Sequence, residues 1–144
     1  MHNQYVNYFM DPFSPYRECN KGPKGQNETF TNAWEGFIRG NLINELYTPY
    51  FNYVPKEPRV FSEKDQLLLP VQALDFMRVE LNLYLDTHPD DVNAINLFAQ
   101  NQIALNEAKR RYEERFGPLV VFNATSTATP WSWTQGWPWE GGRR

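Results

Sequence analysis

The stretch that decides the fold reads Val71-Gln72-Ala73-Leu74-Asp75-Phe76 and continues as Glu80-Leu81-Asn82-Leu83-Tyr84-Leu85-Asp86-Thr87-His88-Pro89. Apolar residues recur in it at spacings of three and four, which is the repeat of one face of an α-helix. They fall into two rows, namely Val71, Leu74, Met77, Leu81 and Tyr84, and then Phe76, Val79, Leu83 and Leu85. One row is enough for a surface helix, so two rows predict a helix that is covered on more than one side. A single neighbouring helix cannot cover both rows, and a flank or a second molecule must contribute.

This first long helix is expected to run from about Pro70 to Asp86, after a short lead-in turn. Ser62 is a good N-cap for that turn, and Glu63 and Asp65 follow where the helix dipole favours acids. Pro70 lacks an N–H and crowds the turn before it, so it either kinks a helix or opens a new one. We favour the second interpretation.

A second long helix is expected from about Asp91 to Phe116. Pro89 stops the first helix, and Asp90 is the expected cap of the second. At the other end, Gly117 suits a left-handed cap. The short turn between the two helices makes them antiparallel neighbours. The apolar row of the second helix is expected at Val92, Ile95, Ala99 and Ile103, extended by Phe98, Leu105, Tyr112 and Phe116.

A shorter helical pattern precedes the hairpin, within residues 30–61. Thr31 or Asn32 can cap it, and Glu35 follows Asn32 at the distance of a capping box. The apolar positions after the cap recur near helical spacing, with a glycine among them: Trp34, Phe37, Ile38, Gly40, Leu42 and Ile43. Pro49 biases the chain before it away from helix, so the remainder of this region is expected to be extended chain and linker.

Both ends of the chain are expected to be extended and rich in aromatic residues. Residues 1–29 carry Pro and Gly at short intervals and are interpreted as a mobile arm. The tail over residues 118–144 holds Trp131, Trp133, Trp137 and Trp139. These indoles either pair across a small hairpin or anchor an extended tail in a groove. The sequence leaves open whether the tail docks on its own hairpin or on a partner.

These patterns together predict an all-α fold. Its main unit is an antiparallel two-helix hairpin over residues 62–117, and a short helix lies before it within residues 30–61. Aromatic-rich flanks over residues 1–29 and 118–144 complete the chain. No convincing alternation of strands and helices occurs, so the sequence gives no support for a parallel-sheet fold.

Composition limits the classes of function. The chain has 144 residues, enough for one domain, and 16% of them are aromatic. Its net charge of −3 argues against nucleic-acid binding, which needs a basic face. Cys19 is the only cysteine, so the chain has no internal disulfide framework. No apolar run reaches about 18 residues and no signal peptide is recognisable, so we expect no membrane span and no general secretion.

No catalytic or metal-binding constellation stands out. His88 lies in sequence among the acids of the inter-helix turn, Asp86, Asp90 and Asp91. Their spacing does not place three ligands on one helix face, and turn and capping chemistry explains the acids. Asp75 and Glu80 lie near Arg78 on a largely apolar helix, which predicts a structural ion pair rather than a catalytic dyad. We therefore expect no enzyme activity, no bound metal and no cofactor.

The hairpin and the tail together resemble a known family, the spore coat protein CotJB family, over about residues 62–140. The segments that carry the resemblance are Gln72 to Phe76, Glu80-Leu81, Tyr84 to Pro89, Phe116 to Leu119, Pro130 to Trp133 and Trp137 to Trp139. Within them the family motif is taken as Asp75, Phe76, Glu80, Tyr84, Asp86, His88 and Pro89. A second resemblance covers Ala33 and Arg39 to Tyr50, which look like the short CotJA coat-associated peptide.

The CotJB resemblance implies a component of the inner spore coat of endospore-forming bacteria, made in the mother-cell cytoplasm. It also implies a coat partner that resembles manganese catalase, to which the metal and the redox chemistry would belong. We expect a non-enzymatic structural protein, and the alternative is an accessory subunit that docks on and stabilises a catalase-like enzyme. Other coat proteins and a second copy of the chain are further candidate partners. The residues expected to bind partners are Trp131, Trp133, Trp137, Trp139, Leu46, Tyr47 and Tyr50.

Overall fold

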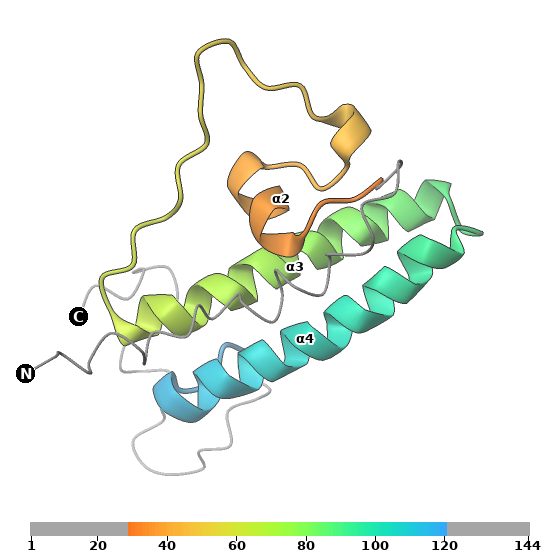
Figure 1. Ribbon diagram of the computed structural model, residues 1–144. Helices are drawn as coiled ribbons and strands as arrows, with labels where there is room; N and C mark the ends of the chain where they lie inside the picture. The colour runs from red at the N-terminus through yellow and green to blue at the C-terminus, as the bar shows by residue number, and fades with distance from the viewer. Residues whose placement is uncertain (1–28, 121–144) are drawn as a thin grey trace, which may run out of the picture.

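The computed structural model describes residues 29–120, and these residues form three α-helices, one 3₁₀ turn and no strand. The helices are α2 (Ala33–Arg39), α3 (Glu63–Thr87) and α4 (Val92–Phe116), and the 3₁₀ turn is η1 (Asn44–Leu46). Figure 1 shows α3 and α4 as an antiparallel hairpin, with α2 packed against α3 on the side away from α4. The prediction of an all-α fold built on a two-helix hairpin is confirmed.

Helix α3 is one continuous element, so the prediction of a separate lead-in turn ending at Pro70 was wrong. Ser62 accepts a hydrogen bond from the N–H of Asp65, and the carboxylate of Asp65 accepts one from the N–H of Ser62. This reciprocal capping box fixes the start of α3 about two turns before Pro70. A proline inside a helix costs about 3 kcal/mol or more. Leu69, Pro70 and Val71 are all buried, and the burial of this apolar run offsets that cost.

The N-terminus of α4 is capped by Asp91 and not, as predicted, by Asp90. The Oδ1 atom of Asp91 accepts hydrogen bonds from the N–H groups of Asn93 and Ala94 at 3.0 and 3.1 Å. Asp90 is exposed and sits one residue too early to reach these N–H groups. At the far end, Gly117 has φ +91 and ψ 176, a conformation open to glycine but outside the left-handed helical region that was predicted.

The core lies between α3 and α4. Its buried members on α3 are Val71, Leu74, Met77 and Leu81, as the first predicted row required. On α4 the buried row is Ala94, Asn101, Leu105, Ala108 and Tyr112. Of the single row predicted for α4, Leu105 and Tyr112 are buried, whereas the prediction was wrong for the four exposed residues Val92, Ile95, Ala99 and Ile103. The buried row continues along the whole helix, whereas the exposed row ends in charged residues after Ile103, so only the first can follow α3 throughout.

The second apolar row of α3 is covered in part. Phe76 packs edge-to-face on Phe37 of α2, with ring centroids 6.3 Å apart. Trp34 of α2 is buried against Leu69 and Ala73. Further along the row, Val79 and Leu83 are exposed. The predicted contribution of a flank to covering this helix is therefore present, but it reaches only the first half of the row.

Candidate partner-binding site

The end of α3 forms an aromatic corner that joins three parts of the chain. The hydroxyl of Tyr84 donates to Asp91 at 3.0 Å, its ring stacks on His88 at 4.2 Å, and Phe30 meets it edge-on at 4.9 Å. The hydrogen bond to Asp91 raises the pKa of Tyr84. The N–H of Ala94, and then the Tyr84 hydroxyl, hold the pKa of Asp91 below its ordinary value. These contacts stabilise the inter-helix turn and attach Phe30, near the start of the described chain, to the end of α3.

Glu80 makes a second link between α3 and the preceding segment. Its Oε2 atom accepts from the N–H of Leu42 at 3.4 Å. The Leu42 side chain itself is fully buried in the main core. The neighbouring backbone runs antiparallel to residues 29–31, because Thr31 N–H donates to Leu42 carbonyl and Asn44 N–H donates to Thr29 carbonyl, both at 2.9 Å. The segment after α2 is thereby clamped on the hairpin.

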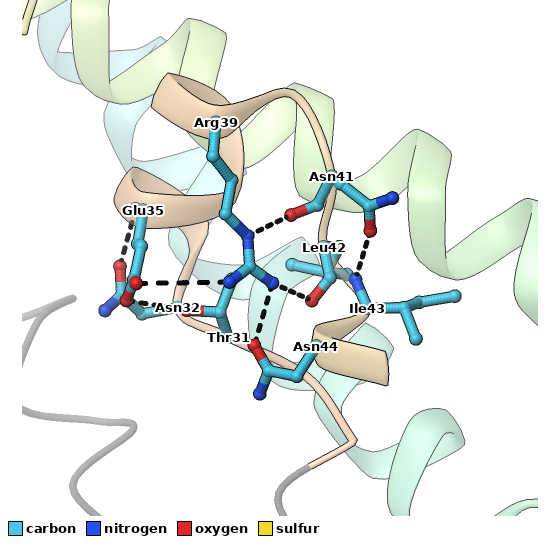
Figure 2. A network of polar contacts seen from close by, with 8 residues as sticks. All are labelled: Thr31, Asn32, Glu35, Arg39, Asn41, Leu42, Ile43 and Asn44. Carbon is cyan, nitrogen blue, oxygen red and sulfur yellow. Dashed lines mark hydrogen bonds and ion pairs between the residues drawn. The ribbon is translucent and has the colours of Figure 1, made fainter. Parts of the chain in front are cut away.

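Arg39 organises the chain between α2 and η1 (Figure 2). Its Nε donates to the Asn41 carbonyl at 2.7 Å, and its Nη2 donates to the Asn44 side chain at 2.8 Å. The same Nη2 reaches the Leu42 carbonyl at 3.3 Å. The guanidinium lies 4.7 Å from the ring centroid of Tyr47, a cation–π contact. With its side chain only 9% exposed, Arg39 acts as a structural hub for the loop.

A cleft of about 400 Å³ opens between α2 and the chain that returns toward α3. Its charged lining residues are engaged already: Glu35 faces Arg39 across 4.0 Å, and Glu57 accepts a hydrogen bond from the Trp34 indole at 3.3 Å. The cleft therefore offers no unpaired acid or base for catalysis.

Residues 46–61, which we call the display segment, present large apolar side chains to solvent. Its exposed apolar members are Leu46, Tyr50, Phe51, Tyr53, Val54, Val60 and Phe61. Phe51 is 93% exposed and stands at the tip of a turn closed by the Tyr53 N–H, which donates to the Tyr50 carbonyl at 3.2 Å. Asn52 supplies the left-handed φ of 58° that this turn needs. The hydrogen bond and the left-handed Asn52 therefore define a turn from which the Phe51 ring projects into solvent.

A second exposed apolar surface, the α4 stripe, consists of Val92, Ile95, Ala99 and Ile103 on the first half of α4. The residues follow one another at helical spacing, so they share one face. Ile103 is 73% exposed. Scattered apolar residues are ordinary on protein surfaces, but a contiguous row is typical of an interaction site.

Several charged residues of α3 and α4 pair with one another. Arg78 contacts Asp75 at 2.9 Å, as the sequence predicted. Near the end of α4, Arg110 and Arg111 bind Glu107, whose pKa falls to about 2, with Arg110 as the first cause. Residues 29–120 contain no group of three metal-ligand side chains, and none of their helices is long and apolar enough to cross a membrane.

The predicted site residues have different surroundings. Leu46 and Tyr50 are exposed, whereas Tyr47 lies half-buried under Arg39. The motif residues Phe76, Glu80, Tyr84 and His88 make internal contacts, and Asp86 and Pro89 are exposed at the turn. The four predicted tryptophan anchors, Trp131, Trp133, Trp137 and Trp139, lie outside the described residues, as does Cys19.

Sequence reasoning missed the roles of Arg39 and Phe30. A single arginine before a Gly-Asn pair gives no pattern that separates a structural hub from a solvated charge. Phe30 precedes the capping residues and has no periodic partner, so its contact with Tyr84 depends on the folding back of residues 29–31 along residues 42–44.

Comparison with known protein families gives a match over the hairpin and the tail. The family model described as CotJB protein matches residues 65–140, which is more than half of the chain and includes α4, nearly all of α3 and the tryptophan-rich tail. No curated protein and no solved structure matches the chain. The match does not reach residues 39–50, so the CotJA-like segment stays a prediction. The chain belongs to the CotJB family and is a spore-coat-related protein.

Proposed function

We propose that this protein is a non-catalytic structural component of the spore coat that assembles through exposed aromatic and aliphatic side chains. Its family supports the coat location, and the mother cell would be the place of synthesis. The partner proposed is a coat protein resembling manganese catalase, which would carry any metal chemistry. Other coat proteins remain candidates for further contacts.

The display segment is the observation that carries this proposal. An ordered turn held by a backbone hydrogen bond keeps Phe51 and its neighbours in solvent, although burying an aromatic side chain contributes about 1.5–3 kcal/mol. Because these side chains are exposed in the folded chain, a partner that buries them can gain this free energy on association. The hairpin keeps its own apolar core, so the display segment is free to serve a partner.

The proposal also includes the tryptophan tail as a second anchor. Trp is the side chain most enriched at interface hot spots, and the family match extends to residue 140. Changing Trp131 and Trp133 to Ala should weaken recruitment to the coat while the helices of residues 62–117 keep their circular dichroism. If the double substitution melts the helices, the indoles belong to the protein's own core.

Co-assembly with the catalase-like partner tests the function as a whole. Tyr50→Ala should lower the amount of protein that co-sediments with the partner, and Tyr50→Phe, which keeps the ring, should not. Retention of the wild-type complex at high dilution would favour the accessory-subunit alternative, because an obligate subunit binds tightly. Peroxide breakdown by the isolated, partner-free chain would contradict the non-catalytic proposal.

A further inference from the structure

Two exposed apolar surfaces lie on different parts of this molecule. The display segment stands beyond α2, on the side of α3 away from α4 (Figure 1). The α4 stripe lies on the other helix of the hairpin. Because α3 separates them, the display segment of one molecule cannot cover the stripe of the same molecule. A contact between these two surfaces therefore has to join two molecules.

The two surfaces carry side chains that can pack on each other. The display segment offers a projecting aromatic turn with Phe51 at its tip, and the stripe offers a row of branched aliphatic side chains on a straight helix. Branched aliphatic side chains separated by Ala99 leave room for a ring to settle between them. Aromatic rings packing on β-branched residues are a common source of interface stability.

Their charges are complementary as well. Lys56 and Arg59 of the display segment are exposed and make no ion pair within residues 29–120. Asp86 at the end of α3 and Asp90 in the inter-helix turn, which precede the α4 stripe in sequence, are equally exposed and make no ion pair in that part of the chain. Opposite charges that flank two apolar surfaces favour their encounter and fix their relative direction.

The lengths agree with this pairing. From Val92 to Ile103 along α4 is about 17 Å at 1.5 Å per residue. From Phe51 to Lys56 an extended chain spans at most about 17 Å. A display segment laid along the stripe can therefore place its aromatic turn near Ile95 and Ile103 while its basic residues lie near the acids of the inter-helix turn.

From these observations we infer that the display segment of one copy binds the α4 stripe of a second copy. The contact joins two different surfaces, so each bound molecule still offers one surface to the next. This inference rests on the proposed assembly role and adds to it the contact by which copies of the chain associate with one another.

Sedimentation equilibrium of the purified full chain tests the contact from both sides. Phe51→Ala and Ile103→Lys should each raise the dissociation constant of self-association about ten- to a hundredfold. Asn52→Gly keeps the left-handed turn and should leave it unchanged. Gln100→Lys places the same charge on another exposed face of α4 and is the matched control for Ile103→Lys. Circular dichroism should show that all four variants keep their helices.

Mixing experiments separate this contact from one between identical surfaces. A Phe51→Ala chain keeps its stripe and an Ile103→Lys chain keeps its display segment, so an equimolar mixture should form a one-to-one complex that neither forms alone. Arg59→Glu and Asp86→Arg should each weaken self-association, and their mixture should restore it, because the acid introduced in one chain then meets the base introduced in the other. Asp86 lies at the carboxyl end of α3, where a cation suits the helix dipole.

Wild-type chain that stays monomeric at every accessible concentration would overturn the inference. So would self-association that Phe51→Ala and Ile103→Lys leave intact, or variant mixtures that stay apart. If the same variants instead lose only the catalase-like partner, the two surfaces serve that partner, and the inference of a second copy fails while the proposed coat function stands.

Discussion

The hairpin and the display segment are both rich in large apolar side chains, and they place them oppositely. Leu81 and Leu105 of the hairpin are 0% exposed, whereas Phe51 of the display segment is 93% exposed. The hairpin achieves burial because two helices can oppose continuous apolar rows. A turn-and-linker segment has no periodic face, so composition alone does not bury its side chains.

The two regions also differ in what holds their backbone. The hairpin depends on apolar packing between α3 and α4. The loop that leads into the display segment depends on hydrogen bonds from Arg39 to two backbone carbonyls and the Asn44 side chain (Figure 2). Apolar packing therefore defines a folded unit, while the polar hub keeps an unburied segment in one place beside it.

The largest expected effect is a loss of stability in the buried core of the hairpin. Leu81→Ala should lower the free energy of unfolding by about 2–5 kcal/mol, because it removes a fully buried side chain and leaves a cavity. Leu83→Ala is the matched control on the same helix, since Leu83 is 58% exposed. Urea denaturation followed by circular dichroism measures both. Equal losses for the two variants would mean that Leu83 is covered in solution.

The buried and displayed regions were not equally predictable from the sequence. The hairpin could be predicted because its periodicity and its turn residues agree: the helical spacing of the apolar residues and the stop at Pro89 point to the same two helices. The face of α4 that contacts α3 could not, since the buried and the exposed residues both recur at helical spacing and only the tertiary contact with α3 decides between them. The prediction at Pro70 was wrong because it considered the cost of about 3 kcal/mol for a proline inside a helix without the apolar packing that offsets this cost.

The site was less predictable than the fold. Leu46 and Tyr50 were expected to bind partners; both are exposed, and their role in binding stays a prediction. Tyr47 could not be separated from them, because its half-burial depends on the Arg39 guanidinium, which reaches it only when residues 40–46 fold back. Contacts between residues distant in sequence leave no local pattern, and the Phe30–Tyr84 pair is of this kind.

The second effect tests the polar hub. Arg39→Lys keeps the charge near Glu35 but removes the fork that donates to Asn41, Leu42 and Asn44. We expect a loss of about 1–3 kcal/mol in the local stability of this loop. Amide hydrogen exchange measures it, with faster exchange at Asn44 and unchanged exchange in the middle of α3.

Glu35→Gln is the control for the hub. The contact between Glu35 and Arg39 spans 4.0 Å and the Glu35 side chain is 60% exposed, so its loss should change exchange little. Unchanged exchange at Asn44 in Arg39→Lys would show that packing of Leu42 and Trp34 holds the loop without the hub.

A smaller effect concerns the buried amide of Asn101 in the hairpin core. The Nδ2 of Asn101 donates to the Leu74 carbonyl at 3.0 Å, while its Oδ1 has no partner among the described residues. Asn101→Leu removes this unpaired oxygen at similar volume, so we expect unchanged or higher stability, by up to about 1 kcal/mol. Asn101→Ala, which leaves space, should be less stable than either. A clear loss in Asn101→Leu would show that the amide does more than align the two helices.

The acid response of the hairpin should be smaller still. Asp91 has its pKa lowered below its ordinary 3.8 by the N–H groups of α4 and by Tyr84, so the unfolded chain binds the proton more readily. The stability from this cap is thus complete above about pH 4 and is lost as the pH falls through the lower, folded-state pKa. Tyr84 acts at the other limit: its pKa is raised above 10.0, so its contribution is complete below pH 10 and is lost at higher pH.

Melting temperatures of wild type and Tyr84→Phe across this range measure the response. Without the hydroxyl, the variant should melt lower than wild type near neutral pH and approach it below about pH 4 and above about pH 10. A difference that is constant with pH would mean that the lost contribution is packing on His88 and Phe30 rather than the hydrogen bond to Asp91.

The smallest expected effect on stability belongs to the most exposed aromatic residue. Phe51→Ala removes a ring that touches almost nothing in the folded chain, so the free energy of unfolding should change by no more than about 0.5 kcal/mol. The turn itself should persist, because the hydrogen bond from Tyr53 N–H to the Tyr50 carbonyl and the left-handed Asn52 do not involve the ring. Denaturation must be measured at low protein concentration, where association adds nothing to apparent stability. At high concentration the wild type should be more stable than the variant if Phe51 is buried on association. A difference that appears only at high concentration shows that the ring packs on another molecule, whereas a difference at both concentrations shows that it packs on its own chain. A loss of about 2 kcal/mol or more at low concentration would place Phe51 with the buried residues of the hairpin and remove the contrast between the two regions.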